Sequence, residues 1–318
     1  MLEQQITHKE PLVSVLVPVY NAAAYLKQCI ESICEQTYAN LQIALINDGS
    51  SDDSWNIMKE WAEKDSRLEI FTQTNHGVGY TRNRLLELAA GDYVLFVDSD
   101  DWIESNTVEF LINNHVGHDI DIVNFQMDTA AADMRGTFSR EQIIHLFLEH
   151  VHCNGSLCNK LIKRTLFGGL QFDESVSYGE DALMIWQVFQ RVSQVDIIKD
   201  RLYHIGKNRN SLSRQHFNNN KFSVYTVWNS ICEDVDVDWP QYSQLAHARF
   251  ACEMTLILRD AVKSGYRDKN YIRPLQDVIR RDGRYITQTG ISTRAMRAFA
   301  WLVSHNYWLA CRISRFVW

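Results

Sequence analysis

Short apolar runs alternate with longer amphipathic segments along the first part of the chain. Continuous runs of Val, Leu and Ile predict strands that are buried on both faces of a sheet, and the segments between them have helical periodicity. Strands that alternate with helices favour a mostly parallel, doubly wound sheet. We therefore expect an α/β fold with a Rossmann-like sheet flanked by helices over about the first 125 residues. The candidate strands are 12–21 (which is closed by Pro18), 41–46, 68–72, 93–97 and 120–124.

Acidic residues follow two of these strands. Asp48 comes at the end of the second, and Asp98-Ser99-Asp100-Asp101 follows the fourth. Ligands bind at the carboxyl ends of the strands in an open α/β sheet, and an Asp-x-Asp pair can share a hard divalent cation through its oxygen atoms. A Mg²⁺ or Mn²⁺ ion there would hold a diphosphate. The alternative is a solvated turn that caps a helix beginning near Ser105.

The glycine-rich phosphate loops of other nucleotide-binding folds are missing from the sequence. The first β-α turn, Pro18 to Ala24, contains no glycine, and Gly77-x-Gly79 alone is a weak signal. No Walker A motif is present either. A phosphate ligand would therefore be held by a cation and by basic side chains.

Composition narrows the class of protein. The chain has 318 residues, of which 46% are hydrophobic and 22% charged, as in an ordinary globular protein of one large or two modest domains. A net charge of -7 argues against nucleic acid as the main partner. Seven cysteines without a C-x-x-C pair fit reduced thiols. With no visible signal peptide or apolar span, we expect a cytoplasmic protein.

Several short motifs occur in a fixed order between residues 12 and 215. They are Pro18–Asn21, Asn47–Asp52, Asn75-x-Gly77 with Thr81–Asn83, Ala90–Asp101, Asn159–Leu161, Phe172-Asp173, Gly179–Asp181 and Tyr203–Ser211. The series resembles that of the family-2 inverting glycosyltransferases with the GT-A fold, and its second half resembles the bacterial members. Thr81 departs from the small Ala that is commoner at this position.

The resemblance implies a function and a division of the chain. A GT-A catalytic domain would span residues 1–217, with a nucleotide-binding half at about 12–125 and an acceptor half at about 126–217. A helical region would follow over 218–318. The enzyme would move a sugar from a UDP-sugar to a saccharide or lipid-linked saccharide with inversion, using Mn²⁺ or Mg²⁺, in the synthesis of bacterial capsule, exopolysaccharide or lipopolysaccharide.

The resemblance also assigns residues to the donor site. Asp48 would accept a hydrogen bond from the uracil ring, although capping of the next helix is an alternative. Asp98 would meet the ribose or the water shell of the metal, and Asp100 would ligate the metal. Arg82 would approach the nucleotide, with a surface salt bridge as the rival interpretation. The other predicted donor-site residues are Pro18, Tyr20, Asn21, Ser99, Lys207 and Arg209.

Two further acids suit the acceptor side of the reaction. Glu180 and Asp181 follow Gly179 and precede an amphipathic helix, so they would lie at its positively polarised N-terminus. By resemblance, Asp181 is the predicted base for the acceptor hydroxyl, and Glu180 orients it or holds the acceptor. Capping preference alone would place the same acids there. Trp102 either stacks on a sugar of the acceptor or lies in the core.

The stretch from Tyr203 to Arg214 has three cations and few apolar residues. A loop of this kind can close over a diphosphate and exclude water. Lys207 and Arg209 are the expected clamps, ahead of His204 and Arg214, and a solvated basic loop is the alternative. The role of Lys160 is open.

The C-terminal part of the chain has helical periodicity over 219–232 and 244–263 and no acid after Asp282. A basic helix with tryptophans can lie in a membrane interface, which favours contact with the inner face of the cytoplasmic membrane. A helix docked by its apolar face is the alternative, and a homo-oligomer is compatible with either. On a single helix, the residues of the polar face are Arg294, Arg297, Trp301, His305, Trp308, Arg312 and Arg315, opposite Met296, Phe299, Val303 and Ala310.

Two other classes of protein share parts of this pattern. A nucleotidyltransferase has a similar sheet and metal, but it would carry a loop with glycine and lysine after the first strand. A binding module would keep the nucleotide-sugar pocket without the chemistry, which the combination of Asp98, Asp100 and Asp181 disfavours. Turnover of a nucleotide sugar separates these classes.

Overall fold

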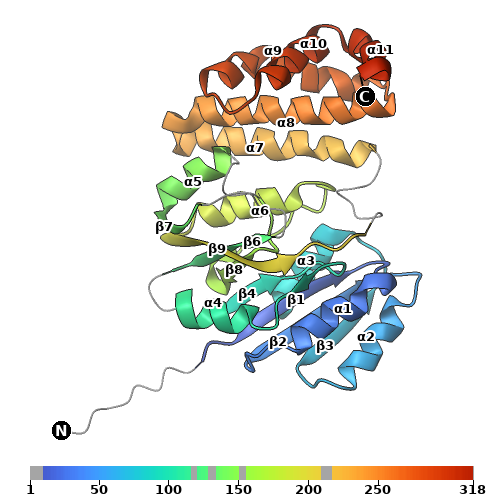
Figure 1. The fold of residues 1–318 in the computed structure, drawn as a ribbon, viewed down its shortest axis with the longest axis vertical. Helices are drawn as coiled ribbons and strands as arrows, with labels where there is room; N and C mark the ends of the chain where they lie inside the picture. The colour runs from blue at the N-terminus through green and yellow to red at the C-terminus, as the bar shows by residue number, and fades with distance from the viewer. Residues whose placement is uncertain (1–9, 116–119, 128–133, 150–154, 209–216, 318) are drawn as a thin grey trace, which may run out of the picture. The chain divides into compact units, whose positions relative to one another are not determined.

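A computed structural model of the chain describes residues 10–115, 120–127, 134–149, 155–208 and 217–317 (Figure 1). The chain forms two compact units. Unit 1 comprises Met1–Arg140, Ser156–Gln171 and Arg191–Asn208, and unit 2 comprises Glu141–Gly155, Phe172–Gln190 and Arg209–Trp318. Each unit is therefore assembled from segments that are distant in the sequence.

Unit 1 contains a mixed sheet. In the described part of the chain the strand order is β3-β2-β1-β4-β8-β6-β9-β5, with β7 paired to β9. The bounds are β1 Val13–Val19, β2 Leu41–Asp48, β3 Leu68–Gln73, β4 Tyr93–Phe96, β5 Trp102–Ile103, β6 Ile122–Met127, β7 Gly136–Ser139, β8 Lys160–Lys163 and β9 Gln194–His204. The α/β class is confirmed.

The first four strands are parallel, as expected: β1 pairs with β2 and β4, and β2 pairs with β3. The candidate strand at 120–124 is present as β6, but β8 lies between it and β4 and is antiparallel to both. Strands β5 and β7 pair with β9 in the antiparallel sense. The parallel strands bring the carboxyl ends of β1, β2 and β4 to one edge of the sheet.

Helices cover this sheet because their apolar residues recur at helical spacing. The bounds are α1 Ala23–Cys34, α2 Ser54–Ala62, α3 Val78–Leu88 and α4 Thr107–His115, with a short 3₁₀ helix at Arg164–Phe167. In α1 the buried residues are Leu26, Cys29, Ile30 and Ile33, which form one stripe. Figure 1 shows α1 and α2 on the same face of the sheet.

Unit 2 is helical in its described part. The bounds are α5 Arg140–Glu149, whose first residue is counted with unit 1, α6 Glu180–Phe189, α7 Ser223–Asp238, α8 Ser243–Ser264, α9 Lys269–Gln288, α10 Arg294–His305 and α11 Tyr307–Val317. Short 3₁₀ helices at Asn219–Phe222 and Pro240–Tyr242 precede α7 and α8. Helix α8 packs against both α7 and α9, and small residues such as Ala246 and Ala251 are fully buried there.

The last predicted helix is divided in two. Asn306 ends α10 with φ -145°, and its side-chain oxygen accepts a hydrogen bond of 2.9 Å from the backbone N–H of Leu309. Asparagine prefers such a capping position to a helix interior, which explains why a single continuous helix was wrong. The predicted faces are otherwise kept. Val303 and Ala310 are buried, whereas Trp301 is 65% and Trp308 43% exposed.

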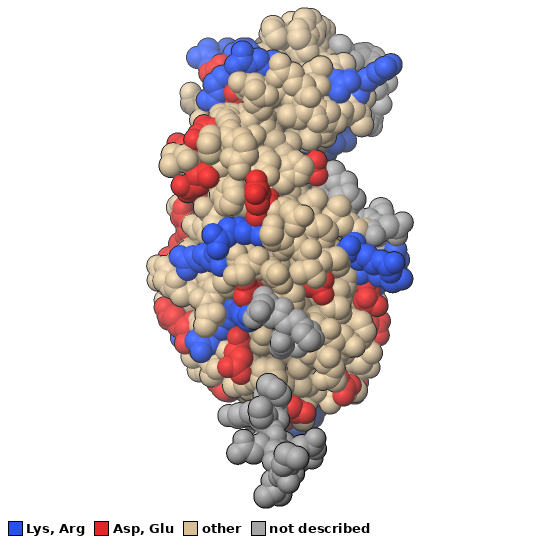
Figure 2. Space-filling model, turned by 90° about the vertical axis from the view of Figure 1, so that its left-hand side faces the viewer, with Lys and Arg blue, Asp and Glu red and all other residues tan. Residues whose placement is uncertain are grey.

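Basic side chains accompany these exposed tryptophans. Arg294 and Arg312 are exposed, and Arg267 lies over the ring of Trp308 at 5.9 Å. Figure 2 shows Lys and Arg side chains, with a few acidic ones among them, on the surface of the C-terminal helices. The side chain of Arg315 is outside the described part of the chain. Within the described ranges, no helix has both the length and the hydropathy that a membrane span requires.

Candidate active site

The loops that follow β1 and β2 are tied together. Asn21 adopts a left-handed conformation with φ 47°, which asparagine tolerates better than most residues. Its side-chain oxygen accepts a hydrogen bond of 2.8 Å from the backbone N–H of Ser51, and its own N–H donates to the Ser50 hydroxyl at 2.9 Å. Pro18 is half-buried and Tyr20 is exposed beside this junction. Two predicted donor-site motifs therefore meet at one edge of the sheet.

Asp48 holds the glycine-bearing loop that precedes α3. One carboxylate oxygen accepts from the backbone N–H of His76 and the other from that of Gly77, both at 2.9 Å. The Gln73 amide donates to the same carboxylate at 2.8 Å. Asp48 does not cap α2, because Asp52 accepts the hydrogen bond from the Ser54 N–H instead. Contact of Asp48 with a uracil ring stays a prediction.

Arg82 and Asp98 form an ion pair. An Nη atom of Arg82 lies 3.3 Å from an oxygen of Asp98. Arg82 thus forms a salt bridge, as the rival interpretation expected, but its own side chain is buried, with Arg82 only 5% exposed. Contact of Arg82 with a nucleotide stays a prediction. The Cys158 thiol donates to the second oxygen of Asp98 at 3.1 Å. Because the Asp98 side chain remains 38% exposed, solvent or a ligand can reach it.

Asp101 is the acid of this cluster that the sequence left without a role. It is buried and accepts hydrogen bonds of 2.7 Å from the Tyr203 hydroxyl and from the backbone N–H of Gly206. The Tyr203 hydroxyl in turn accepts from the Asp98 N–H at 3.1 Å. Burial raises the pKa of Asp101 to about 7, and the negative charge of Asp98 adds to this effect. Asp101 therefore joins the end of β4 to the end of β9.

The predicted basic loop begins against the same acids. The Asn208 amide donates to Asp100 at 3.0 Å, and a Cβ atom on Gly206 would lie 1.8 Å from the Asp100 carbonyl oxygen. Lys207, between them, is exposed. The contribution of residues 203–208 to this site is thus structural as well as electrostatic. Arg209 and Arg214 lie outside the described residues.

Trp102 and His204 interact with each other. Their rings are stacked at 5.3 Å with an interplanar angle of 13°, and His204 Nε2 lies 2.6 Å from a Glu104 oxygen. Both side chains are half-buried. Ser99 lies in the turn between the two metal-site candidates Asp98 and Asp100. Binding of ligand by Trp102 and Ser99 stays a prediction.

Lys160 is fully buried at the start of β8. Its ammonium group donates to the Ser156 carbonyl at 2.6 Å and to the Asn159 side-chain oxygen at 2.9 Å. These bonds close the turn that enters the strand. The presence of Lys160 in the Asn159–Leu161 motif therefore has a structural explanation.

Glu180 and Asp181 form the first turn of α6, directly after Gly179 with φ 89°. The Asp181 carboxylate accepts a hydrogen bond of 2.9 Å from the backbone N–H of Ala182, and Glu180 is buried. Both acids therefore lie at the helix N-terminus, as expected. They belong to unit 2, so their convergence with Asp98 and Asp100 stays a prediction.

The acids of unit 1 suit a hard cation. Within the described residues, no three His, Cys, Asp or Glu side chains are grouped as a metal site. Mg²⁺ and similar ions need fewer protein ligands when a nucleotide is present, because one or two carboxylates are completed by phosphate oxygens and water. Asp98 and Asp100 offer oxygen atoms of this kind, and their role as metal ligands stays a prediction.

The structure is an α/β protein with acidic side chains at the carboxyl ends of β2 and β4. The model for the family described as "Glycosyl transferase family 2" matches residues 14–175, which is half of the chain. The chain belongs to this family.

Curated relatives include bacterial glycosyltransferases and a teichoic acid biosynthesis protein. The chain is 35% identical over 226 residues to Glycosyltransferase GlyA of Streptococcus pneumoniae, covering 64% of this chain and 31% of that protein. It is 33% identical over 201 residues to the minor teichoic acid biosynthesis protein GgaB of Bacillus subtilis, covering 60% and 22%. The chain thus spans less than a third of the length of these two relatives.

Solved structures share the fold. TarS 1-349 of S. aureus in complex with UDP-GlcNAc superposes with a TM-score of 0.67 at 18% identity, covering 92% of both chains. The mannosyltransferase PcManGT from Pyrobaculum calidifontis, in complex with GDP-Man and Mn²⁺, superposes with a TM-score of 0.56 at 14% identity. The matched region covers 97% of this chain and 88% of the PcManGT chain. The expected GT-A fold is confirmed.

Proposed function

We propose that the chain transfers a sugar from a UDP-sugar to a hydroxyl group of a saccharide acceptor, with inversion at the anomeric carbon. The observation that carries this proposal is the cluster of side chains at the carboxyl end of β4. There the partly exposed Asp98 carboxylate forms an ion pair with the buried Arg82, and the Asp100 carboxylate accepts a hydrogen bond from the Asn208 amide. Membership of the glycosyltransferase family and the UDP-GlcNAc complex of TarS support the choice of donor.

The donor nucleotide would occupy the edge formed by the loops after β1, β2 and β4. Asp48 accepts N–H donors through both oxygens and would present remaining acceptor capacity to the uracil N–H. Arg82 and Lys207 would offset the charge of the diphosphate. Pro18, Tyr20, Asn21 and Ser99 would shape the pocket around the nucleoside. We also assign Arg209 to the diphosphate, on the basis of its motif.

A Mn²⁺ or Mg²⁺ ion would be held by Asp100 and Asp98. When bound, the ion would supply positive charge that balances the diphosphate leaving group. The PcManGT complex with Mn²⁺ supports the use of a divalent ion in this fold. The residues of the chain contribute fixed oxygen atoms and the adjacent Arg82 guanidinium.

On the acceptor side, Asp181 would act as the base. A bond forms between the acceptor oxygen and the anomeric carbon as the bond from that carbon to UDP breaks, and the hydroxyl proton passes to the Asp181 carboxylate. Glu180, buried beside it, would orient the base or hold the acceptor. Trp102 is assigned to the acceptor because its half-buried ring is held by His204 near the acidic cluster. We keep the proposal of a catalytic domain over 1–217 followed by a helical region over 218–318, although Glu180 and Asp181 fold with unit 2.

The acceptor would belong to a bacterial surface polymer, such as capsule, exopolysaccharide, lipopolysaccharide or teichoic acid. The name of the GgaB relative supports this setting. We further propose that α10 and α11 bind the inner face of the cytoplasmic membrane, because Trp301, Trp308 and Leu309 are exposed beside arginines.

The experiment is a donor assay. The purified chain is incubated with Mn²⁺ and UDP-glucose, UDP-galactose, UDP-GlcNAc, UDP-GalNAc or UDP-glucuronate, and release of UDP is followed with and without EDTA. We expect release from at least one UDP-sugar, faster with an acceptor extract and abolished by EDTA. GDP-mannose serves as the control donor. Binding of UDP without turnover under every condition would favour a non-catalytic module and contradict the proposal.

A further inference from the structure

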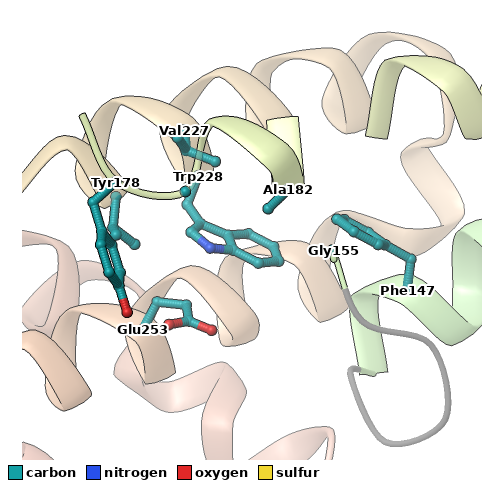
Figure 3. Close-up of a pocket in the computed structure, with 9 residues that line it drawn as sticks. Phe147, Gly155, Tyr178, Ala182, Val227, Trp228 and Glu253 are labelled. Carbon is teal, nitrogen blue, oxygen red and sulfur yellow. The ribbon is translucent and has the colours of Figure 1, made fainter. Parts of the chain in front are cut away.

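A cavity of about 140 Å³ lies in unit 2 beside the first turn of α6 (Figure 3). Gly179 and Ala182, which flank Glu180 and Asp181 in the sequence, contribute to its wall. Figure 3 shows the hydroxyl of Tyr178 and the carboxylate of Glu253 at the same end of the cavity. The cavity thus combines an apolar wall with one polar end.

The aromatic side chains of the wall are fixed in place. Trp228 is packed by Phe147, whose ring is stacked on it at 6.0 Å, and by the Arg249 guanidinium at 5.5 Å. Tyr178 is half-buried, and its backbone exchanges hydrogen bonds of 2.9 and 2.8 Å with the Ser223 hydroxyl. An aromatic ring that carries a hydroxyl group, as in Tyr178, suits a ligand that is apolar on one side and polar on the other.

The acids around Tyr178 already have cationic partners. Glu253 pairs with Arg249, and Asp260 lies 3.7 Å from the Lys221 ammonium, which is also 5.8 Å from the Tyr178 ring. A cationic ligand would therefore gain little binding free energy from these acids. A carboxylate offers about four lone-pair sites, so a paired carboxylate still accepts hydrogen bonds from neutral hydroxyl groups.

The Tyr178 hydroxyl is a second polar group for such a ligand. Burial, and then the negative charges of Asp181 and Glu253, raise the pKa of Tyr178, so the hydroxyl remains protonated and can donate.

The volume gives room for a single ring. A closed cavity of roughly 150 Å³ in another protein holds one benzene molecule. This pocket of about 140 Å³ is half open, so it has room for one six-membered ring whose substituents would extend into solvent. We propose that this cavity is the subsite for one neutral pyranose of the acceptor, with its C–H face on Tyr178 and its hydroxyls bonded to Glu253. The inference rests on the proposed function and adds to it the part of unit 2 that recognises the acceptor.

The test is saturation-transfer NMR with the methyl glycosides of glucose, galactose, GlcNAc and GalNAc. We expect at least one to bind with contacts to its ring C–H groups. Tyr178→Leu, which removes the ring but keeps apolar bulk, should weaken this binding about tenfold. Glu253→Gln should weaken it by a similar factor, since a hydrogen bond to a charged acceptor is lost. Tyr178→Phe should weaken it less than Tyr178→Leu.

Glu233→Gln, on the exposed side of α7, is the matched control and should bind like the parent chain. Melting temperatures confirm that each variant is folded. UDP binding with Mn²⁺ is measured in the same samples and should be unchanged in all variants. If UDP binds and no glycoside does, or if Tyr178→Leu and Glu253→Gln bind the glycosides like the parent, the subsite is wrong. If glycosides bind as expected but UDP does not, the subsite stands and the proposed transferase fails.

Discussion

Glycine at position 206 is required by the close contact between two segments of the candidate donor site. Its N–H donates to Asp101, and its Cα lies so near Asp100 that an added Cβ would stand 1.8 Å from the carbonyl oxygen. No rotamer change relieves a clash between a Cβ and a backbone atom. The segment that carries Lys207 would have to move.

Gly206→Ala should therefore weaken the binding of UDP by at least about tenfold, because Asp100 and Lys207 lose their common position. The measurement is calorimetric titration with UDP and Mn²⁺. Gly283→Ala is the control: its Cβ would meet only Ile279 at 3.8 Å inside α9, and alanine favours a helix by about 0.5–1 kcal/mol over glycine. Equal UDP affinity in the two variants would refute this account of residue 206.

The same residues show how far sequence reasoning reaches at this scale. Asp48, Asp98 and Asp100 were placed at strand ends correctly, because an apolar run that stops at an acid is a local signal. Asp101 was missed, since its partner Tyr203 is 102 residues away and no periodicity relates them. The burial of Arg82 was equally invisible, because a charged residue on a helix is usually exposed.

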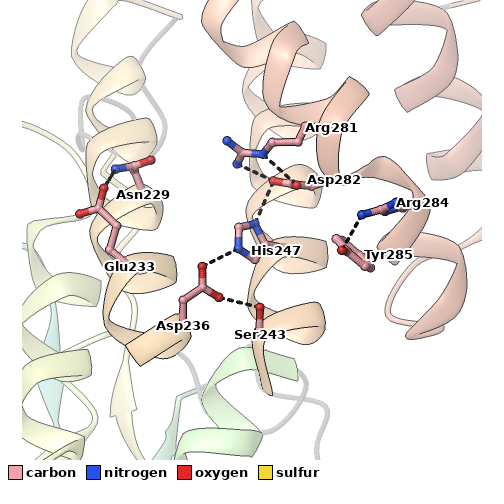
Figure 4. A network of polar contacts seen from close by, with 9 residues as sticks. All are labelled: Asn229, Glu233, Asp236, Ser243, His247, Arg281, Asp282, Arg284 and Tyr285. Carbon is pink, nitrogen blue, oxygen red and sulfur yellow. Dashed lines mark hydrogen bonds and ion pairs between the residues drawn. The ribbon is translucent and has the colours of Figure 1, made fainter. Parts of the chain in front are cut away.

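At the scale of helices, a polar network joins α7, α8 and α9 (Figure 4). His247 of α8 lies 3.1 Å from a carboxylate oxygen of Asp236 and 3.0 Å from one of Asp282, and Arg281 also bonds Asp282. The hydrogen bond to Asp282 is the main cause that raises the pKa of His247. Burial alone would raise the pKa of Asp282, but the bonds from His247 and Arg281 outweigh it and lower that pKa.

The sign of the pH dependence follows. A raised His247 pKa stabilises the fold below about pH 6.5, and this contribution is lost as the pH rises through the folded value. The lowered pKa values of Asp282 and Asp236 stabilise the fold above about pH 4, and that contribution is lost as the pH falls. The network is thus strongest between about pH 4 and 6.5.

His247→Gln should reduce the free energy of unfolding by about 1–3 kcal/mol near pH 6, with a smaller loss at pH 9. Urea unfolding at the two pH values measures the difference from the parent chain. His305→Gln, at an exposed site, is the control and should reduce the free energy of unfolding near pH 6 by less than His247→Gln does. A loss for His247→Gln that is the same at both pH values would contradict the charged form of the histidine.

The pair α10 and α11 is the second element with a testable role. The double variant Trp301→Ser with Trp308→Ser should lower binding to vesicles that contain phosphatidylglycerol by about tenfold or more, because interfacial tryptophans and arginines act together. Co-sedimentation at low and high salt measures it. Val237→Ser removes an exposed apolar residue from α7 and should leave binding unchanged. If the parent chain does not co-sediment with such vesicles, the proposed membrane contact is wrong.

Element prediction succeeded where periodicity was long. The strands β1 and β2 and the helices α1, α7 and α8 appear where the pattern placed them. Strand β5 has two residues and β7 and β8 have four, too few for a period to emerge. Strand β4 is equally short but was found because all four of its residues are apolar. Strand β9 has 11 residues but was missed, because charged residues interrupt its apolar ones, so the antiparallel part of the sheet was not foreseen. The break at Asn306 was missed because one capping residue interrupts an otherwise continuous apolar stripe.

At the scale of the whole molecule, the chain separates the candidate donor residues from the candidate base. Asp98, Asp100 and Arg82 belong to unit 1, whereas Glu180 and Asp181 belong to unit 2. Local patterns do not show which distant segments fold together, so residues 172–190 gave no sequence signal of their association with the C-terminal helices. Because the two sets of residues belong to different units, we expect substitutions in unit 1 and in unit 2 to affect different steps, UDP binding and sugar transfer.

Asp181→Asn should keep UDP binding and lose transfer by about 10²–10⁴-fold, because an amide does not take the acceptor proton. Asp100→Ala should instead weaken UDP binding in Mn²⁺, with little effect on the weaker binding seen in EDTA. Titration with UDP and assay of UDP release are run on both variants, with Asp277→Asn on the exposed face of α9 as control. If Asp181→Asn transfers sugar at the parent rate, the base is another residue. If Asp100→Ala binds UDP and Mn²⁺ like the parent, the nucleotide is held without the Asp-x-Asp pair.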